Sequence, residues 1–155
     1  MATVRMKRPI TIWLLFFWLF LLALGGLYGG IAMLLDPSGS LLQMTEVLPL
    51  LPVKDYILPG LFLLGVMGVF PLFLLYGLLI RPKGLLDKSI ISPARYHRAW
   101  TGTVVLGILL AIWLFIQGIL IGFQWPIQYL TAINGLLIML FAFLPSVRRF
   151  YHQRQ

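Results

Sequence analysis

The sequence predicts an all-α membrane protein, in which four transmembrane helices form one antiparallel bundle with both termini in the cytoplasm. Composition is the first reason, because 61% of the 155 residues are hydrophobic, far more than in a soluble domain. The second is that four apolar runs, at residues 10–35, 56–80, 99–123 and 127–147, contain no Asp, Glu, Lys, Arg or His. Each run reaches the length of about 20 residues with which a helix crosses a bilayer.

The positive charge predicts the orientation of the chain. Of the 12 Lys and Arg residues, all but Lys54 lie in the first, third or fifth of the segments that flank the apolar runs. Such an imbalance is typical of cytoplasmic segments. The residues that we expect to set this topology and to contact anionic lipid headgroups include Arg5, Lys7, Arg8, Arg81, Lys83, Lys88, Arg95, Arg98, Arg148 and Arg149.

The first predicted helix spans residues 10–35, and an interfacial outer loop follows at 36–55. Pro9 suits a first helical turn, and Trp13 is expected to anchor the helix at the inner interface. Asp36-Pro37-Ser38-Gly39 ends it, because Pro37 cannot continue a helix. Within the loop, we expect a short interfacial helix at 40–46, followed by an extended return through Pro49 and Pro52.

The second predicted helix spans 56–80, and Pro71 in its interior is expected to kink it. A packing role or a hinge would both fit this proline. The inner loop, 81–98, combines basic and apolar residues and is expected to lie on headgroups.

The third and fourth helices are predicted at 93–123 and 126–147. Ser92-Pro93 would begin the third, and Trp100 would anchor it at the membrane interface. The very short link between them, with Trp125 as a second anchor, predicts a helical hairpin. We find no soluble domain, so residues 1–155 are treated as one four-helix domain.

Glycines at four-residue spacing are the candidate helix-packing sites. Small residues at this spacing let another helix approach closely. Contact within the chain, dimerisation and docking on a partner would all use such a strip. The candidates are Gly25, Gly26, Gly29, Gly30, Gly118 and Gly122.

Gln117, Asn134 and Thr131 form a possible polar site inside the membrane. An unpaired amide in hydrocarbon costs several kcal/mol, so each amide should face a partner. Counted from Trp125, Gln117 and Asn134 fall at similar depths of the predicted hairpin. A hydrogen bond between them is the simpler expectation, and a site for a lipid, quinone or pigment is the alternative.

The sequence predicts no catalytic residue, no metal site and no cofactor. The absence of cysteine excludes thiolate ligands, and His97 and His152 lie outside the spans without metal-ligand spacing. Asp36, Glu46 and Asp55 in the outer loop have no evident partner base. The net charge of +8 lies beside the spans and not in a nucleic-acid-binding patch, so nucleic acid is not expected.

Several short motifs resemble a group of uncharacterised bacterial four-helix membrane proteins. They are the glycine-rich first helix running into Asp36-Pro37-Ser38-Gly39, the Leu58-Pro59-Gly60 sequence, and Trp113 followed by Gln117-Gly118. The arrangement also superficially resembles DoxX-like proteins. The resemblance implies a four-helix fold in the bacterial cytoplasmic membrane and no particular activity. In similar sequences the position of Gln117 is often a glutamate, so this chain would lack an ionisable group there.

Together these features predict a membrane protein that is not an enzyme. It would act by helix packing, as an accessory or scaffolding subunit of a membrane complex or as a homo-oligomer. Its partners would be membrane lipids and either a membrane protein or a second copy. The alternatives are a binder or transporter of a lipophilic molecule at Gln117 and Asn134 and, as the weakest, a membrane enzyme that uses the outer-loop carboxylates.

Overall fold

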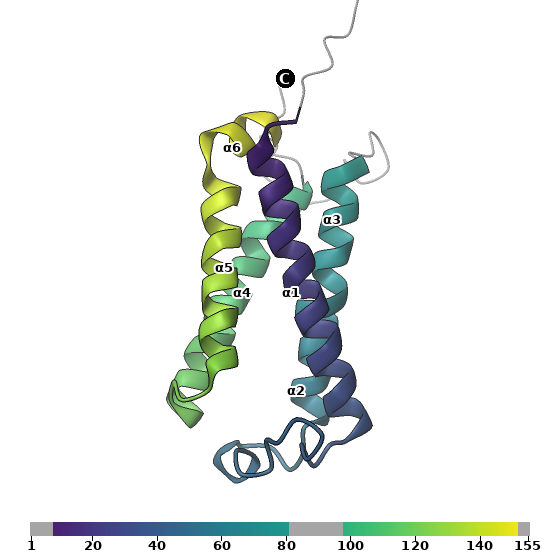
Figure 1. Ribbon diagram of the computed structural model, residues 1–155, viewed down its shortest axis with the longest axis vertical. Coiled ribbons are helices and arrows are strands. Elements are labelled where there is room, and N and C mark those ends of the chain that lie inside the picture. Colours follow the sequence, from purple (N-terminus) through teal and green to yellow (C-terminus); the bar gives the residue numbers. More distant parts are fainter. Residues whose placement is uncertain (1–7, 81–97, 152–155) are drawn as a thin grey trace, which may run out of the picture.

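The computed structural model describes residues 8–80 and 98–151. Within these ranges every regular element is helical, and four helices are long and apolar enough to cross a membrane. These findings confirm, for the described residues, the prediction of an all-helical chain with four helices able to span a membrane. Figure 1 shows the four helices running along the long axis of the molecule.

The first span is a single helix, whereas the second changes its hydrogen-bond register on the way. Helix α1 covers Ile10–Leu35. The second span consists of α2 (Ile57–Phe62), the π-helical segment η2 (Leu63–Val69) and α3 (Phe70–Ile80). The amide of Phe70 still donates to the carbonyl of Gly65 in the π register, and Pro71, the next residue, has no N–H to donate. The change back to α-helix therefore coincides with the missing donor.

The third and fourth spans form a hairpin that is shorter than the apolar runs. Helix α4 covers Arg98–Ile121 and ends where Gly122 adopts a φ of 69°, a conformation that favours glycine. Helix α5 covers Pro126–Phe143 and does not continue to 147 as the sequence suggested, because Leu144 is extended before Pro145. A separate helix, α6 (Pro145–Tyr151), follows.

The connection between α1 and α2 contains no helix at 40–46, so that expectation was wrong. The chain forms successive turns there, and Gln43 has a φ of 55°, which interrupts any right-handed helix. The first short helix of the connection is η1, a 3-10 turn at Leu48–Leu50 that contains Pro49. Pro49 therefore lies in a turn and not in an extended strand.

The two ends of the bundle are formed by different segments of the chain. The start of α1 and helix α6 lie at one end, called here the terminal end, and residues 36–56 and the turn between α4 and α5 lie at the other, the loop end (Figure 1). Polar contacts tie the terminal end together. They include Arg8 to the carbonyl of Leu79, Thr11 Oγ1 to Ser146 Oγ at 2.9 Å, Trp100 Nε1 to the Ala142 carbonyl at 2.8 Å and Tyr151 to the Leu78 carbonyl at 3.1 Å.

The hydrophobic core lies mainly in the terminal half of the bundle. Its fully buried members include Leu15 and Leu19 of α1, Leu78 of α3 and Leu106 of α4. Helix α1 packs against the second span and α5, while α4 packs against α5 and α3. Many large apolar side chains point outward along all four spans, as lipid-facing surfaces require.

Candidate functional site

The observed register of the hairpin separates Gln117 from Asn134. The positions of Gly107 against Met139 and of Gly135 against Leu110 fix how α4 and α5 lie side by side. Counted from these contacts, Gln117 lies opposite residues 128–129, and Asn134 lies opposite residues 111–112. The two amides are therefore about 8 Å apart along the helix axis, and within the described chain no hydrogen bond joins their side chains. The count from Trp125 missed this offset because α5 begins directly at Pro126, whereas α4 ends before Gly122.

Asn134 lies at the point along α5 where one face of the helix changes from buried to exposed. One face of α5 carries residues spaced by three and four positions, namely 127, 131, 134, 138 and 141. This face is turned by about 100° from the face of Gly135, which contacts α4. Because α5 otherwise packs on α1 and α6, this second face is the one toward α1. Ile138 is 1% exposed and Asn134 is 7% exposed, whereas Ile127 is 60% and the adjoining Leu130 is 62% exposed.

Helix α1 shows the same loss of cover. One face of α1 carries residues 11, 15, 18, 22, 25 and 29. At the terminal end of this face, Thr11 contacts Ser146. Leu15 and Leu22 on this face are buried. A methyl group placed on Gly25, however, would meet nothing within 4 Å, and on Gly29 only the Leu63 side chain.

These two faces together form what we call the α1–α5 divide, defined by Gly25 and Gly29 on α1 and by Ile127, Leu130 and Asn134 on α5. In Figure 1, α1 and α5 come together near α6 and separate toward the loop end. The divide is thus a stretch of the loop-end half in which neither helix covers the other.

An unsatisfied acceptor marks the point where the divide begins. The Asn134 side chain is buried, and its Oδ1 atom accepts no hydrogen bond within the described chain. A buried amide oxygen without a donor costs about 1–3 kcal/mol, and lipid tails supply no donor. The Asn134 oxygen is therefore enclosed by the chain and left without a donor among its described residues.

Two of the predicted glycines lie against the second span. A methyl group on Gly26 would lie 2.3 Å from the carbonyl carbon of Met67, and one on Gly30 would lie 2.6 Å from the Leu64 amide nitrogen. The backbone of η2 thus approaches α1 at these positions as closely as only glycine allows. Gly26 and Gly30 serve contact within the chain, whereas Gly25 points away from it.

The two predicted glycines near the end of α4, Gly118 and Gly122, have local roles. The ring of Phe123 covers Gly118 so closely that a methyl group on this glycine would lie 2.5 Å from the ring, so no neighbouring helix reaches it there. Gly122 terminates α4 with its positive φ. Thr131 is also engaged locally, since its hydroxyl donates to the Ile127 carbonyl at 2.8 Å.

Sequence reasoning overlooked Gln128, which is the buried amide that organises the hairpin turn. Its Oε1 accepts hydrogen bonds from the amides of Gln124 and Trp125 at 3.2 and 3.1 Å, and its Nε2 donates to the Gly122 carbonyl at 3.0 Å. The signal was present in the sequence, because Gln at the third position of a helix that begins with proline is a capping-box residue.

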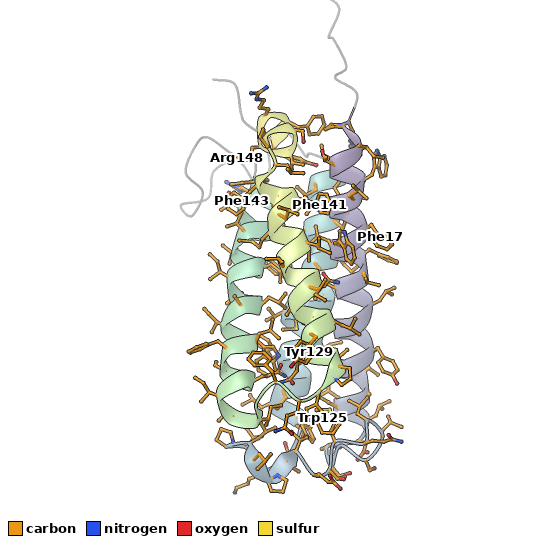
Figure 2. The ribbon with its side chains drawn as sticks, turned by 60° about the vertical axis from the view of Figure 1, so that its left-hand side comes forward. Phe17, Trp125, Tyr129, Phe141, Phe143 and Arg148 are labelled. Carbon is orange, nitrogen blue, oxygen red and sulfur yellow. The ribbon has the colours of Figure 1, made fainter. Side chains whose placement is uncertain are left out.

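The predicted interfacial residues fall into different settings. Trp13 is exposed, Trp125 is half-buried at the start of α5, and Trp100 is buried, with its Nε1 donating to the Ala142 carbonyl. Arg148 and Arg149 are exposed on α6, and one buried Arg98 nitrogen, Nη2, has no hydrogen-bond partner within the described chain. Figure 2 shows Trp125 and Tyr129 at the loop end and Arg148 at the opposite end. Arg5, Lys7, Arg81, Lys83, Lys88 and Arg95 lie outside the described residues, as do His97 and His152.

The outer-loop carboxylates that could have served an enzyme hold local structure. Asp36 accepts hydrogen bonds from the hydroxyls of Ser38 and Ser40, both at 2.6 Å, and from the Leu41 amide at 2.7 Å. These bonds hold the pKa of the Asp36 carboxyl well below its usual value. Asp55 accepts from the Ile57 amide at 3.0 Å at the start of α2.

Tyr56 closes this loop over the end of the bundle. Its hydroxyl donates to the Met44 carbonyl at 2.8 Å, and its ring lies against Gly39. Burial raises the pKa of the Tyr56 hydroxyl. Within residues 8–80 and 98–151, no group of three or more His, Cys, Asp or Glu side chains is placed to hold a metal ion.

Comparisons with known proteins add no assignment. No family profile matches the chain, and neither the curated proteins nor the solved structures contain a significant match.

Proposed function

We propose that this chain is an integral membrane protein that acts through helix packing, as an accessory or scaffolding subunit of a membrane complex. The observation that carries the proposal is that most of the hydrophobic core lies in the terminal half. In the loop-end half, the facing sides of α1 and α5 are uncovered at the same depth, next to an unpaired amide oxygen. A helix supplied by another subunit would cover those faces.

The test is the mass of the particle extracted directly from the membrane into polymer nanodiscs. Native mass spectrometry should find the 17.6 kDa chain together with another membrane polypeptide. Several copies of the chain alone would make it a homo-oligomer, the other form of a helix-packing role. A single chain that carries only lipid under every mild condition would contradict the proposal.

The proposed topology is an antiparallel bundle with both termini in the cytoplasm, and the proposed location is the bacterial cytoplasmic membrane. It is supported by the gathering of Arg8, Arg148 and Arg149 at the terminal end, where positive charge would face the cytoplasm. Because the chain has no cysteine, single cysteines at residue 3, at Ser40 and at residue 153 can be labelled without background. Labelling of Ser40→Cys alone by an impermeant reagent from outside is expected. Any other pattern would refute this topology.

A second candidate function is the binding or transport of a lipophilic molecule, such as a lipid, quinone or pigment. The unpaired Oδ1 of Asn134 favours it, although Gln117 lies too far along the helix to share the same site. A ligand retained by the wild-type chain and lost from Asn134→Leu would favour this function over the first.

A further inference from the structure

We infer that the inner face of α4 is hydrated at Gln117, so that water fills a recess inside the loop-end half of the bundle. The recess is the space beside three residues of α4, namely Trp113, Leu114 and Gln117. Its ligand is water, held by the amide of Gln117. This site goes beyond the proposed role in helix packing and does not depend on it.

The inner face of α4 is identified by its buried residues. Residues 103, 106, 110, 114, 117 and 121 follow spacings of three and four and share one face of the helix. On this face Leu106 is fully buried, Leu110 is 2% exposed and Ile121 is 8% exposed. Leu114 and Gln117 lie between Leu110 and Ile121 but are only partly buried. The chain therefore covers this face on both sides of Gln117 along the helix, and covers it less well at Gln117 itself.

The neighbouring helices show that Gln117 faces the interior of the bundle. Phe62 of α2 stacks on Trp113 with ring centroids 4.4 Å apart, and Leu110 lies against Gly135 of α5. Around the axis of α4, Gln117 falls between these two residues, about 40° from Trp113 and about 20° from Leu110. The Gln117 side chain therefore projects between α2 and α5, away from the outer surface of α4.

The Gln117 amide has no partner in the chain, yet it is not enclosed. Its side chain forms no hydrogen bond with residues 8–80 or 98–151. Neither its oxygen nor its nitrogen belongs to the enclosed unpaired atoms, in contrast to Asn134 Oδ1. A primary amide needs both a donor and an acceptor, and water supplies both. The accessible amide is therefore a site at which water can bind.

The depth of Gln117 favours water over lipid tails. Gln117 lies four residues before Ile121, the last residue of α4, which is about 6 Å along the helix axis. Helix α4 has 24 residues and is about 36 Å long, so it exceeds the hydrocarbon thickness of about 30 Å. Gln117 is therefore close to the loop-end boundary of the hydrocarbon. Water has to enter by only about one helical turn, whereas lipid tails offer the amide neither a donor nor an acceptor.

Cysteine labelling of the full chain in nanodiscs, where the reagent reaches both faces of the membrane, tests this hydration. Because the chain has no cysteine, Leu114→Cys and Gln117→Cys each place a single thiol on the inner face. Phe115→Cys and Ile119→Cys are the matched controls, since these positions lie at the same depth and are 67% and 68% exposed on the outer surface. A positively charged methanethiosulfonate reacts with the thiolate. The inner thiols should react about 10-fold faster or more, because hydrocarbon strongly disfavours the charged thiolate.

A second set of variants tests the role of the amide. In the Leu114→Cys chain, Gln117→Leu should slow labelling about 10-fold, because the recess loses the group that holds water. Gln117→Asn keeps an amide and should preserve the rate. Adding Gln117→Leu to Phe115→Cys controls for folding, since the outer thiol should stay unreactive as long as the bundle remains folded.

Two results would overturn the inference. The first is equal labelling rates for inner and outer thiols, which is expected if lipid tails or packed side chains fill the recess. The second is a rate at Leu114→Cys that Gln117→Leu leaves unchanged, because water would then not depend on the amide. Neither result depends on the mass of the nanodisc particle, so hydration of the recess and the role in helix packing can fail separately.

Discussion

Single residues decide where backbones meet and which polar groups are satisfied. Gly26 permits contact with the second span, Gln128 satisfies the hairpin turn, and Asp36 holds the loop after α1. The first two can each be tested against a neighbour of the same type that lacks the contact. Because the neighbour is of the same residue type but lacks these contacts, the comparison isolates their effect.

Gly26→Ala should destabilise the fold by about 1–3 kcal/mol, because the added methyl group would overlap the backbone at Met67. Gly25→Ala is the control, since nothing lies within 4 Å of the added group. The free energy of unfolding of both variants can be measured by denaturant titration in micelles. Equal effects of the two substitutions would show that α1 does not pack on η2 through Gly26.

Gln128→Leu should cost about 1–3 kcal/mol, because two amides and one carbonyl of the turn would lose their partner. Gln124→Leu, at an exposed position in the same turn, should change stability little. Hydrogen exchange at residues 122–128 would report the loss locally. Unchanged protection in Gln128→Leu would mean that its side chain does not organise the turn.

The depressed pKa of Asp36 predicts how the loop responds to acid. A carboxyl whose pKa is lower in the folded than in the unfolded chain stabilises the fold at pH values above its ordinary pKa of 3.8. This contribution is lost as the pH falls through the lower pKa of the folded chain. The loop should therefore keep its structure at pH 4. A carboxyl-carbon NMR titration should place the midpoint for Asp36 below 3.8, and a midpoint at or above that value would contradict the hydrogen-bonded geometry.

At the scale of elements, hydropathy predicted the four spans because each run is apolar on all sides. It could not predict the π-helical segment, which depends on how η2 sits on Gly26 and Gly30. It also extended the last helix past Pro145, although the extended conformation that proline imposes on Leu144 was available to sequence reasoning. The pairing of Gln117 with Asn134 failed for a different reason, because register depends on turn geometry that residue counting does not supply.

Helix α6 illustrates an element that one side chain ties to a helix far away in the sequence. It is a short helix after a proline break, anchored by the buried Tyr151, whose hydroxyl donates to the Leu78 carbonyl of α3. Tyr151→Phe keeps the ring and removes this bond, which should cost about 1 kcal/mol. Hydrogen exchange of α6 should then speed up, while exchange in α5 stays the same. Unchanged exchange in α6 would show that the bond from Tyr151 to Leu78 does not stabilise it.

At the scale of the whole molecule, α1 and α5 meet at the terminal end and separate toward the loop end (Figure 1). Arg8, Thr11, Trp100 and Tyr151 link separate helices at the terminal end, and the core lies beside them. Toward the loop end, α1 and α5 separate (Figure 1), while Phe62 of α2 still stacks on Trp113 of α4 with ring centroids 4.4 Å apart. This asymmetry connects the packing of the chain to its proposed role, since a partner helix would complete the half that the chain leaves open.

The most direct test of this architecture is a pair of distances between nitroxide labels on α1 and α5, measured in bilayers by pulsed electron resonance on the purified chain. One pair is Phe17 and Leu140, near the terminal end, and the other is Tyr28 and Leu130, near the loop end; all four side chains are exposed. The α1–α5 divide predicts a longer distance for the second pair, and a shift in that distance alone when the partner is added. Equal distances would mean that α1 and α5 stay together over their whole length, and they would contradict the account.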